Sequence, residues 1–171
     1  MKTLIKIILA WALAIVMVAP ANAQDKKAIK KAKKAAEVKE LIDAQNYVFK
    51  ATYMYPNGGG QRYLTTDYDV TVSRDTVESF LPYFGVVYAG AGYNSSSDNG
   101  VKFTSTKFNY TADLQKNGSY RIIIKPNDVT GTTQMFLDIF PNGNANLSVI
   151  SLNRERIRYD GYIKERRKPK A

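Results

Sequence analysis

The 171-residue sequence contains no histidine and no cysteine, and its single tryptophan is Trp11. Without these side chains the chain cannot form a Ser-His-Asp or Cys-His nucleophilic site, a zinc site of imidazole or thiolate ligands, or a haem site with the usual axial ligands. Glycoside hydrolysis by two carboxylates stays open, because it needs only Asp or Glu. These absences favour a binding or structural role over catalysis.

The N-terminal segment predicts export. Lys2 and Lys6 precede an apolar run over residues 7–18, and the small-residue sequence Ala21–Ala23 forms a cleavage site. This order is typical of a cleaved signal peptide over residues 1–23, and the apolar run is shorter than the ~20 residues that span a bilayer. We therefore expect a periplasmic or extracellular mature chain. Because no cysteine follows, we expect no lipid anchor. Because the apolar run is short, we expect no transmembrane span in the mature chain.

The net charge of +10 is concentrated near the two ends of the chain. Residues 24–45 hold seven lysines and four acidic residues, and residues 164–171 hold five basic residues and one acidic residue. Residues 46–163 hold eleven basic and ten acidic residues, a net charge of +1. A nucleic-acid-binding body would need a basic stripe, so we expect no nucleic-acid partner. Residues 164–171 are expected to form a disordered, solvated tail.

Residues 24–45 predict a helical extension, because they lack Pro and Gly and consist mostly of Ala, Lys and Glu. At 100° per residue, Val38, Leu41 and Ile42 lie nearly opposite an arc of alanines and Ile29. We expect the second half of the helix to dock on the body and the lysine-rich first half to be a solvated spacer. The alternative is contact with a membrane or an anionic polymer, but a stripe of alanines offers little apolar area for insertion.

From Asn46 onward the sequence alternates between apolar and polar residues, which is the pattern of half-buried strands. Asn-Gly pairs between such runs favour hairpins. The predicted strands are residues 47–55, 67–72, 101–114, 120–125, 132–140, 144–152 and 156–163, with a short helical turn over 73–80 and an apolar stretch over 81–88. Since no strand is followed by a crossover helix, residues 46–163 are expected to fold as an antiparallel β-barrel or β-sandwich of about eight strands.

Three segments of the sequence are distinctive, namely LPYFGVVYAGAGY at Leu81–Tyr93, GVKF at Gly100–Phe103 and NGNANLSVISLNRERIRYDGYI at Asn142–Ile163. Together they resemble the family named domain of unknown function 4251. The resemblance implies a signal-bearing antiparallel β domain exported by Gram-negative bacteria. It implies no activity and no catalytic residues.

The aromatic segment that starts at Tyr83 is the main candidate for a ligand site. Tyr and Phe side chains at a Gly-rich strand edge can line an apolar pocket, which makes Tyr83, Phe84, Tyr88 and Tyr93 candidate ligand-binding residues. The alternative is that this segment is a corner of the hydrophobic core. The lack of tryptophan in the mature chain disfavours stacking on sugars.

The charged candidates have plainer alternatives. Asp67 and Asp69 share a strand face, and Asp75 and Glu78 share a face of the predicted helical turn, but neither pair has a feature that raises a carboxyl pKa. Asp98, Asn99 and Gly100 are similar to part of a calcium loop but lack its other ligands, so a turn explains them better.

A further charged group alternates along the last predicted strand. Arg154, Arg156 and Arg158 share one strand face and are suited to clamping phosphate or carboxylate groups. An ordinary charged surface is the alternative, because Glu155 and Asp160 lie nearby.

The sequence thus predicts a non-catalytic, exported β domain that binds an apolar small molecule or a component of the cell envelope, with no cofactor and no metal site. A structural or protein-interaction module of the envelope is the main alternative. A carboxylate-based hydrolase is a remote one, which would depend on Asp67 or Asp69.

Overall fold

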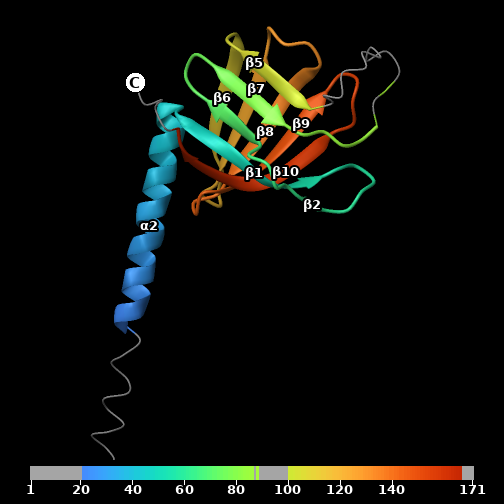
Figure 1. Ribbon diagram of the computed structural model, residues 1–171. Coiled ribbons are helices and arrows are strands. Elements are labelled where there is room, and N and C mark those ends of the chain that lie inside the picture. The colour runs from blue at the N-terminus through green and yellow to red at the C-terminus, as the bar shows by residue number, and fades with distance from the viewer. Residues whose placement is uncertain (1–20, 87, 89–99, 167–171) are drawn as a thin grey trace, which may run out of the picture.

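The computed structural model describes residues 21–86, 88 and 100–166, in which one helix precedes ten strands (Figure 1). The predicted signal peptide lies almost wholly outside these residues. Helix α2 spans Ala21–Ala44. The strands are β1 (Tyr47–Tyr55), β2 (Arg62–Tyr63), β3 (Asp69–Val72), β4 (Val77–Leu81), β5 (Val101–Ser105), β6 (Phe108–Leu114), β7 (Tyr120–Pro126), β8 (Thr132–Ile139), β9 (Asn144–Ser151) and β10 (Ile157–Glu165).

The strands form a nearly closed antiparallel barrel, which confirms the predicted fold class. Their order around the sheet is β5-β4-β3-β1-β10-β9-β8-β7-β6, and β2 pairs with the second half of β1. The two edge strands, β5 and β6, are consecutive in the chain. A short corner over residues 106–107 joins them, so the described strands close the barrel by a turn and not by a ladder.

Asp128 holds this corner in place. Its carboxylate accepts hydrogen bonds from the backbone nitrogens of Thr106, at 2.9 Å, and Lys107, at 3.0 Å, and from the Ser105 hydroxyl. The hydrogen bonds from Ser105 and the two amides lower the pKa of Asp128 to about 2. The charged form of Asp128 therefore stabilises the fold.

We expect Asp128→Asn to lower the melting temperature at pH 7, with the difference from wild type shrinking at low pH. A depressed carboxyl pKa stabilises the fold above the unfolded value of about 4, and this contribution is lost between about pH 4 and pH 2. Thermal melts at pH 7, 4 and 2 measure the effect. The control is Asp113→Asn on exposed β6. An equal difference at pH 7 and pH 2 would contradict the role given to this carboxylate.

The interior of the barrel is filled by buried side chains from nearly every strand. Tyr47, Phe49, Met54, Ile122 and Leu147 each have a relative exposure of 1% or less. Along a strand, successive side chains point alternately into the barrel and outward. In β4, for example, Val77, Ser79 and Leu81 are buried and the residues between them are exposed.

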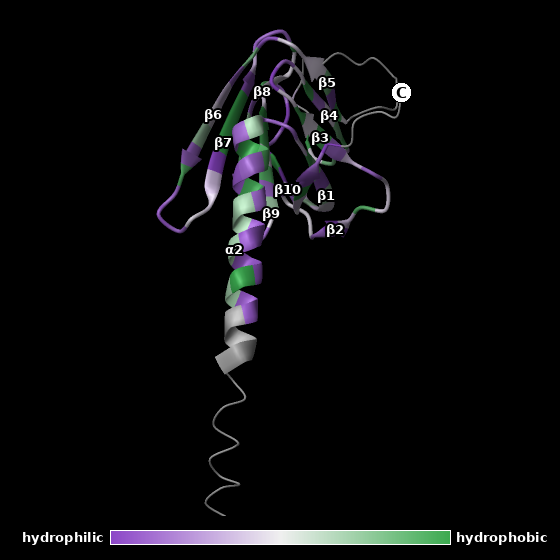
Figure 2. Ribbon diagram, turned by 90° about the vertical axis from the view of Figure 1, so that its left-hand side faces the viewer, coloured by the Kyte–Doolittle hydropathy of each residue, from purple (hydrophilic) through white to green (hydrophobic). Residues whose placement is uncertain are grey.

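Helix α2 packs against the barrel only with its C-terminal half, as predicted. Val38 and Ile42 are 1% and 2% exposed and belong to the main core, whereas residues 26–34 are exposed throughout. The helix stands out from the barrel (Figure 1), and hydrophilic residues alternate with apolar ones around its projecting part (Figure 2). The helix ends at Ala44, and the next residue, Gln45, has a φ of 49° that turns the chain into β1.

The helical turn predicted over residues 73–80 is wrong, because Val77–Leu81 is strand β4. The Ser73 hydroxyl donates to Asp75 Oδ1 at 2.8 Å and accepts from the Thr76 backbone nitrogen at 3.1 Å, so these polar residues build a tight turn between β3 and β4. Side chains that cap helices also form such turns. Asp75 and Glu78 therefore share no helical face.

Two predicted boundaries also differ from the structure. The strand predicted over 101–114 is two strands, β5 and β6, because the chain turns at the corner that Asp128 holds. Strand β10 continues to Glu165, two residues into the predicted tail, because Lys164 and Glu165 pair with β1. The division of 101–114 into two strands, the short strand β2 and strand β4 explain why the structure has ten strands where about eight were predicted. Within the described part of the chain, no helix is long and apolar enough to cross a membrane.

Candidate binding surfaces

Tyr83 is a core residue at one end of the barrel. It is 6% exposed, and its hydroxyl donates to the backbone oxygens of Val86, at 2.9 Å, and Glu155, at 3.2 Å. The Glu155 backbone nitrogen also donates to the Val86 backbone oxygen. These hydrogen bonds connect the segment after β4 to the connection between β9 and β10. Burial raises the pKa of Tyr83, which keeps the hydroxyl protonated as a donor. Tyr83 therefore fits the alternative interpretation, in which this segment forms a corner of the hydrophobic core.

The other predicted ligand-binding residues lie on the surface or outside the described residues. Phe84 is 50% and Tyr88 52% exposed, and the Arg62 guanidinium lies 4.8 Å from the centre of the Phe84 ring. Tyr93 lies outside the described residues. The structure thus separates buried Tyr83 from Phe84 and Tyr88, and the binding role of these residues stays a prediction.

We expect Tyr83→Phe to reduce the free energy of unfolding by about 1 kcal/mol, because it removes a hydroxyl that donates to two backbone oxygens. Urea unfolding followed by circular dichroism measures this change. Tyr63→Phe is the control, since Tyr63 is 64% exposed and lies outside the core. Equal stability of Tyr83→Phe and wild type would show that the corner does not depend on this hydroxyl.

The predicted acidic pair Asp67 and Asp69 faces a lysine. Lys50 Nζ lies 2.7 Å from Asp69 Oδ2 and 3.6 Å from Asp67 Oδ1. Partial burial works to lower the pKa of Lys50, but the hydrogen bond and charge of Asp69 outweigh it and the pKa is raised. Both carboxylates are therefore engaged as partners of a cation, which is not the arrangement of a general acid beside a general base.

The calcium-like loop is described only at its last residue. Asp98 and Asn99 lie outside the described residues, and a Cβ on Gly100 would lie 2.6 Å from the backbone oxygen of Leu81, which explains a glycine by close packing. No group of three or more acidic side chains in the described ranges is placed to hold a metal ion.

The three predicted arginines do not form one cluster. Arg154 precedes β10, lies 5.2 Å from the centre of the Tyr83 ring and donates to Gly100 O at 3.1 Å. Arg156 and Arg158 are exposed and lie on the outer face of the barrel. The Nε atom of Arg156 donates to Ser148 Oγ at 2.5 Å, and the Arg158 guanidinium lies 4.2 Å from the centre of the Tyr55 ring.

Arg156 and Arg158 line an open groove of about 490 Å³ that crosses the outer face from β7 to β10. The register between the strands brings the residues of this groove together. Arg158 lies opposite Ser148 of β9, and Ser148 lies opposite Phe136 of β8. In the next row Asn146 and Asp138 connect β10 to Arg121 of β7. Every strand beneath the groove is paired on both sides, so its side chains stand on a rigid base.

The charges of the groove are unequally neutralised. Arg121 makes two hydrogen bonds to Asp138, at 2.7 and 3.0 Å, and Arg158 Nε lies 3.7 Å from Asp160 Oδ1. Among the described residues, no carboxylate forms an ion pair with Arg156. The end of the groove formed by β9 and β10 therefore carries the unbalanced positive charge.

Comparison with known proteins identifies the family of this chain. The family model described as "Domain of unknown function (DUF4251)" matches residues 29–163, which include the docked half of α2 and all of the barrel except the last two residues of β10. The chain belongs to the DUF4251 family. No curated protein matches the sequence.

A solved member supports the same architecture for this DUF4251 protein. The crystal structure of a DUF4251 family protein from Bacteroides eggerthii is similar with a TM-score of 0.59 and 16% sequence identity, and the match covers 77% of this chain and 87% of that one. At this identity the similarity concerns the fold alone, so the binding surfaces of this DUF4251 chain are argued from its own residues.

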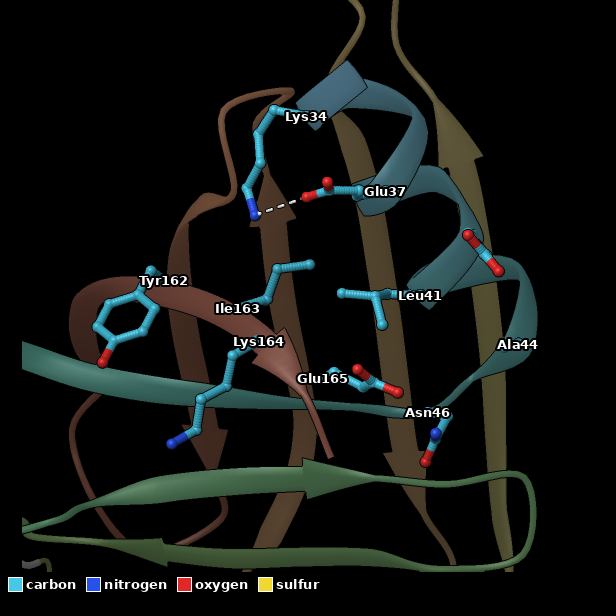
Figure 3. Close-up of a pocket in the computed structure, with 10 residues that line it drawn as sticks. Lys34, Glu37, Leu41, Ala44, Asn46, Tyr162, Ile163, Lys164 and Glu165 are labelled. Carbon is cyan, nitrogen blue, oxygen red and sulfur yellow. Dashed lines mark hydrogen bonds and ion pairs between the residues drawn. The ribbon is translucent and has the colours of Figure 1, made fainter. Parts of the chain in front are cut away.

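A second hollow of this DUF4251 domain lies between α2 and β10 (Figure 3). It has a volume of about 560 Å³, and its apolar wall is formed by Leu41, Ala44 and Ile163. Its charged residues have both signs, and Lys34 pairs with Glu37 at 3.2 Å. Because these charges partly balance each other, the cleft favours no class of ligand as clearly as the arginine groove does.

Sequence reasoning missed Arg121 and Phe136 of the groove. Both stand at outward positions of alternating strands, beside inward Ile122 and Leu137. That alternation is a signal for exposure, but it does not tell which outward residues meet across four strands. The register between the strands decides this, and it is known only from the structure.

Proposed function

We propose that this protein is an exported, non-catalytic module of the cell envelope that binds a partner protein through the outer face of its barrel. The groove across β7–β10 supports the proposal most directly, because it presents three arginines and Phe136 on or directly beside paired strands. Interface hot spots are enriched in arginine and aromatic residues, and interface cores are poor in Lys and Glu. The groove is lined by neither Lys nor Glu.

The remaining features are consistent with this role. The mature chain has no His or Cys for nucleophilic catalysis, and Asp67 and Asp69 are engaged with Lys50. The barrel interior is occupied by buried side chains such as Phe49, Ile122 and Leu147, so the outer face offers the surface for a partner. Projecting α2 would then hold the barrel away from its neighbours.

Site-specific photo-crosslinking in the native bacterium tests this function. A photoreactive phenylalanine analogue at Phe136 is expected to yield one discrete crosslinked product in the envelope fraction. The same analogue at Thr111, an outward position two strands away in the same row, is the control and is expected to yield none. No product at Phe136, or equal products at both positions, would contradict the proposal.

Export has its own measurement. We expect the intact mass of the protein from the envelope to correspond to a chain that begins at Gln24, because the predicted cleavage site ends at Ala23. A mass that includes residues 1–23, in a protein found in the cytoplasm, would contradict export and the envelope role together.

A second candidate function is binding of an apolar small molecule at the end of the barrel near Tyr83. It is favoured by four exposed apolar side chains in two segments that are joined by the hydrogen bond from Tyr88 N to Asn153 O. These side chains are Phe84, Val86, Tyr88 and Leu152. A thermal-shift screen with fatty acids and bile acids tests this function, and Tyr88→Ser should abolish any shift that depends on this surface.

A further inference from the structure

We infer that Arg156 and Arg158 bind the carboxylate groups of an acidic segment in the partner protein. The inference rests on the proposed function, because it names the chemistry that is recognised at the same groove. Arg156 directly precedes β10 and Arg158 is its second residue, and both are exposed on either side of buried Ile157. Two residues of extended chain place their Cα atoms about 7 Å apart.

The unbalanced charge of Arg156 is the first support. Arg121 shows what a satisfied arginine looks like on this surface, since Asp138 binds it through both carboxylate oxygens. Arg156 instead uses Nε to donate to the neutral hydroxyl of Ser148. In the described ranges it has no acidic partner, so an incoming carboxylate can bind its planar guanidinium in the same bidentate way.

Preorganisation is the second support. The Tyr55 ring lies beneath the Arg158 guanidinium at 4.2 Å, and Asp160 lies beside it, with Oδ1 3.7 Å from Nε. Asp160 also raises the pKa of Tyr55. An arginine fixed in this way loses less conformational entropy when a partner binds.

The aromatic rings favour a peptide over a sugar polymer as the source of the carboxylates. Stacking on sugars needs a free ring face, but Arg158 covers a face of Tyr55. Farther along the same outer face, Tyr53 and Tyr63 meet edge to face with ring centres 5.3 Å apart. Arginine beside tyrosine and phenylalanine is instead the composition of protein interfaces.

The test is a titration of the purified chain lacking residues 1–23, followed by ¹⁵N–¹H chemical shifts. The probe is a peptide of four Glu-Ala repeats, and its Gln-Ala counterpart is the neutral control. We expect shifts at the outward residues of β8–β10 with the acidic peptide alone, and weaker binding at higher salt. R156Q/R158Q is expected to weaken binding at least tenfold. K107Q/K125Q, which removes the same charge from exposed positions outside the groove, is expected to weaken it less than twofold.

Three results would overturn the inference. One is an equal loss of peptide binding in the two double variants, or chemical-shift changes confined to the lysines of α2. Either outcome means that the peptide is attracted by charge alone. Another is binding of the Gln-Ala peptide as well as the acidic one. The third is groove binding by polygalacturonate and not by the acidic peptide, which would assign the groove to an acidic sugar. The spectra of each variant report folding directly.

The crosslinking experiment separates this inference from the proposed function. If the product at Phe136 forms equally in R156Q/R158Q and wild type, a partner binds the groove without these arginines and only the inference fails. If no product forms in either protein, the proposed function fails first.

Discussion

Gly161→Ala will lower the free energy of unfolding by about 3 kcal/mol, the upper part of the usual range for overpacking. Gly161 lies opposite Ala51, where β1 carries an extra residue before its pairing with β10 resumes at Tyr53. A Cβ on Gly161 would lie 1.9 Å from the backbone oxygen of Lys50 and 3.1 Å from Ala51 Cα. Backbone atoms cannot yield as a flexible side chain can, so β1 and β10 must separate locally.

The consequence should be large, because β1 and β10 are neighbours in the middle of the sheet and both supply core residues such as Phe49 and Tyr159. Thermal unfolding measures it, and a loss of this size corresponds to a drop of roughly 10 °C in Tm. Gly60→Ala is the matched control, since no atom lies within 4 Å of its Cβ position. If the two variants melt together, the bulge tolerates a side chain and the packing argument is wrong.

The strands and hairpins of this barrel were predictable from local sequence. Alternation over residues 47–55 defines β1, and the Asn-Gly turns at Gly118 and Gly143 lie between the strands they were expected to join. Both glycines have φ near +80°, at 79° and 87°, which is the conformation these turns require. Local chemistry determines such features, so they can be recognised without knowing the fold.

Contacts between distant segments were not predictable. Ser73 and Asp75 have the composition of a helix start, but the pairing of Val77–Leu81 with β3 and β5 outweighs that local preference. The break between β5 and β6 likewise depends on Asp128, which is more than 20 residues away in the chain. These features follow from tertiary pairing, which a single sequence does not reveal.

The candidate surfaces likewise have features that local sequence predicts and features that depend on tertiary contacts. That Arg156 and Arg158 share a face follows from their spacing, and the structure confirms it. Their neighbours Arg121 and Phe136 come from β7 and β8, and only the register of three antiparallel pairs brings them to one groove. For Tyr83, the residue types fitted both a pocket and a core corner, and the hydrogen bonds of its hydroxyl show the corner.

Ile42→Ala is expected to reduce the free energy of unfolding by about 3 kcal/mol, as for other buried isoleucines that are truncated to alanine. Ile42 is 2% exposed and lies in the main core with Val38. The end of α2 is also tied to the barrel by its backbone, because the Arg74 side chain donates to Ala44 O at 3.3 Å. A cavity at Ile42 should therefore weaken the barrel and not merely loosen the helix.

The same helix supplies a control of identical chemistry. Ile29 is 67% exposed, so Ile29→Ala removes the same atoms without forming a cavity, and alanine is the better helix former. We expect its stability to stay within about 0.5 kcal/mol of wild type. Urea unfolding, followed together with limited proteolysis of α2, distinguishes the outcomes. If Ile42→Ala exposes α2 to protease while the barrel unfolds at the wild-type midpoint, α2 is a separable extension. If both change together, the docked half of α2 is part of the cooperative fold and only residues before it act as a spacer.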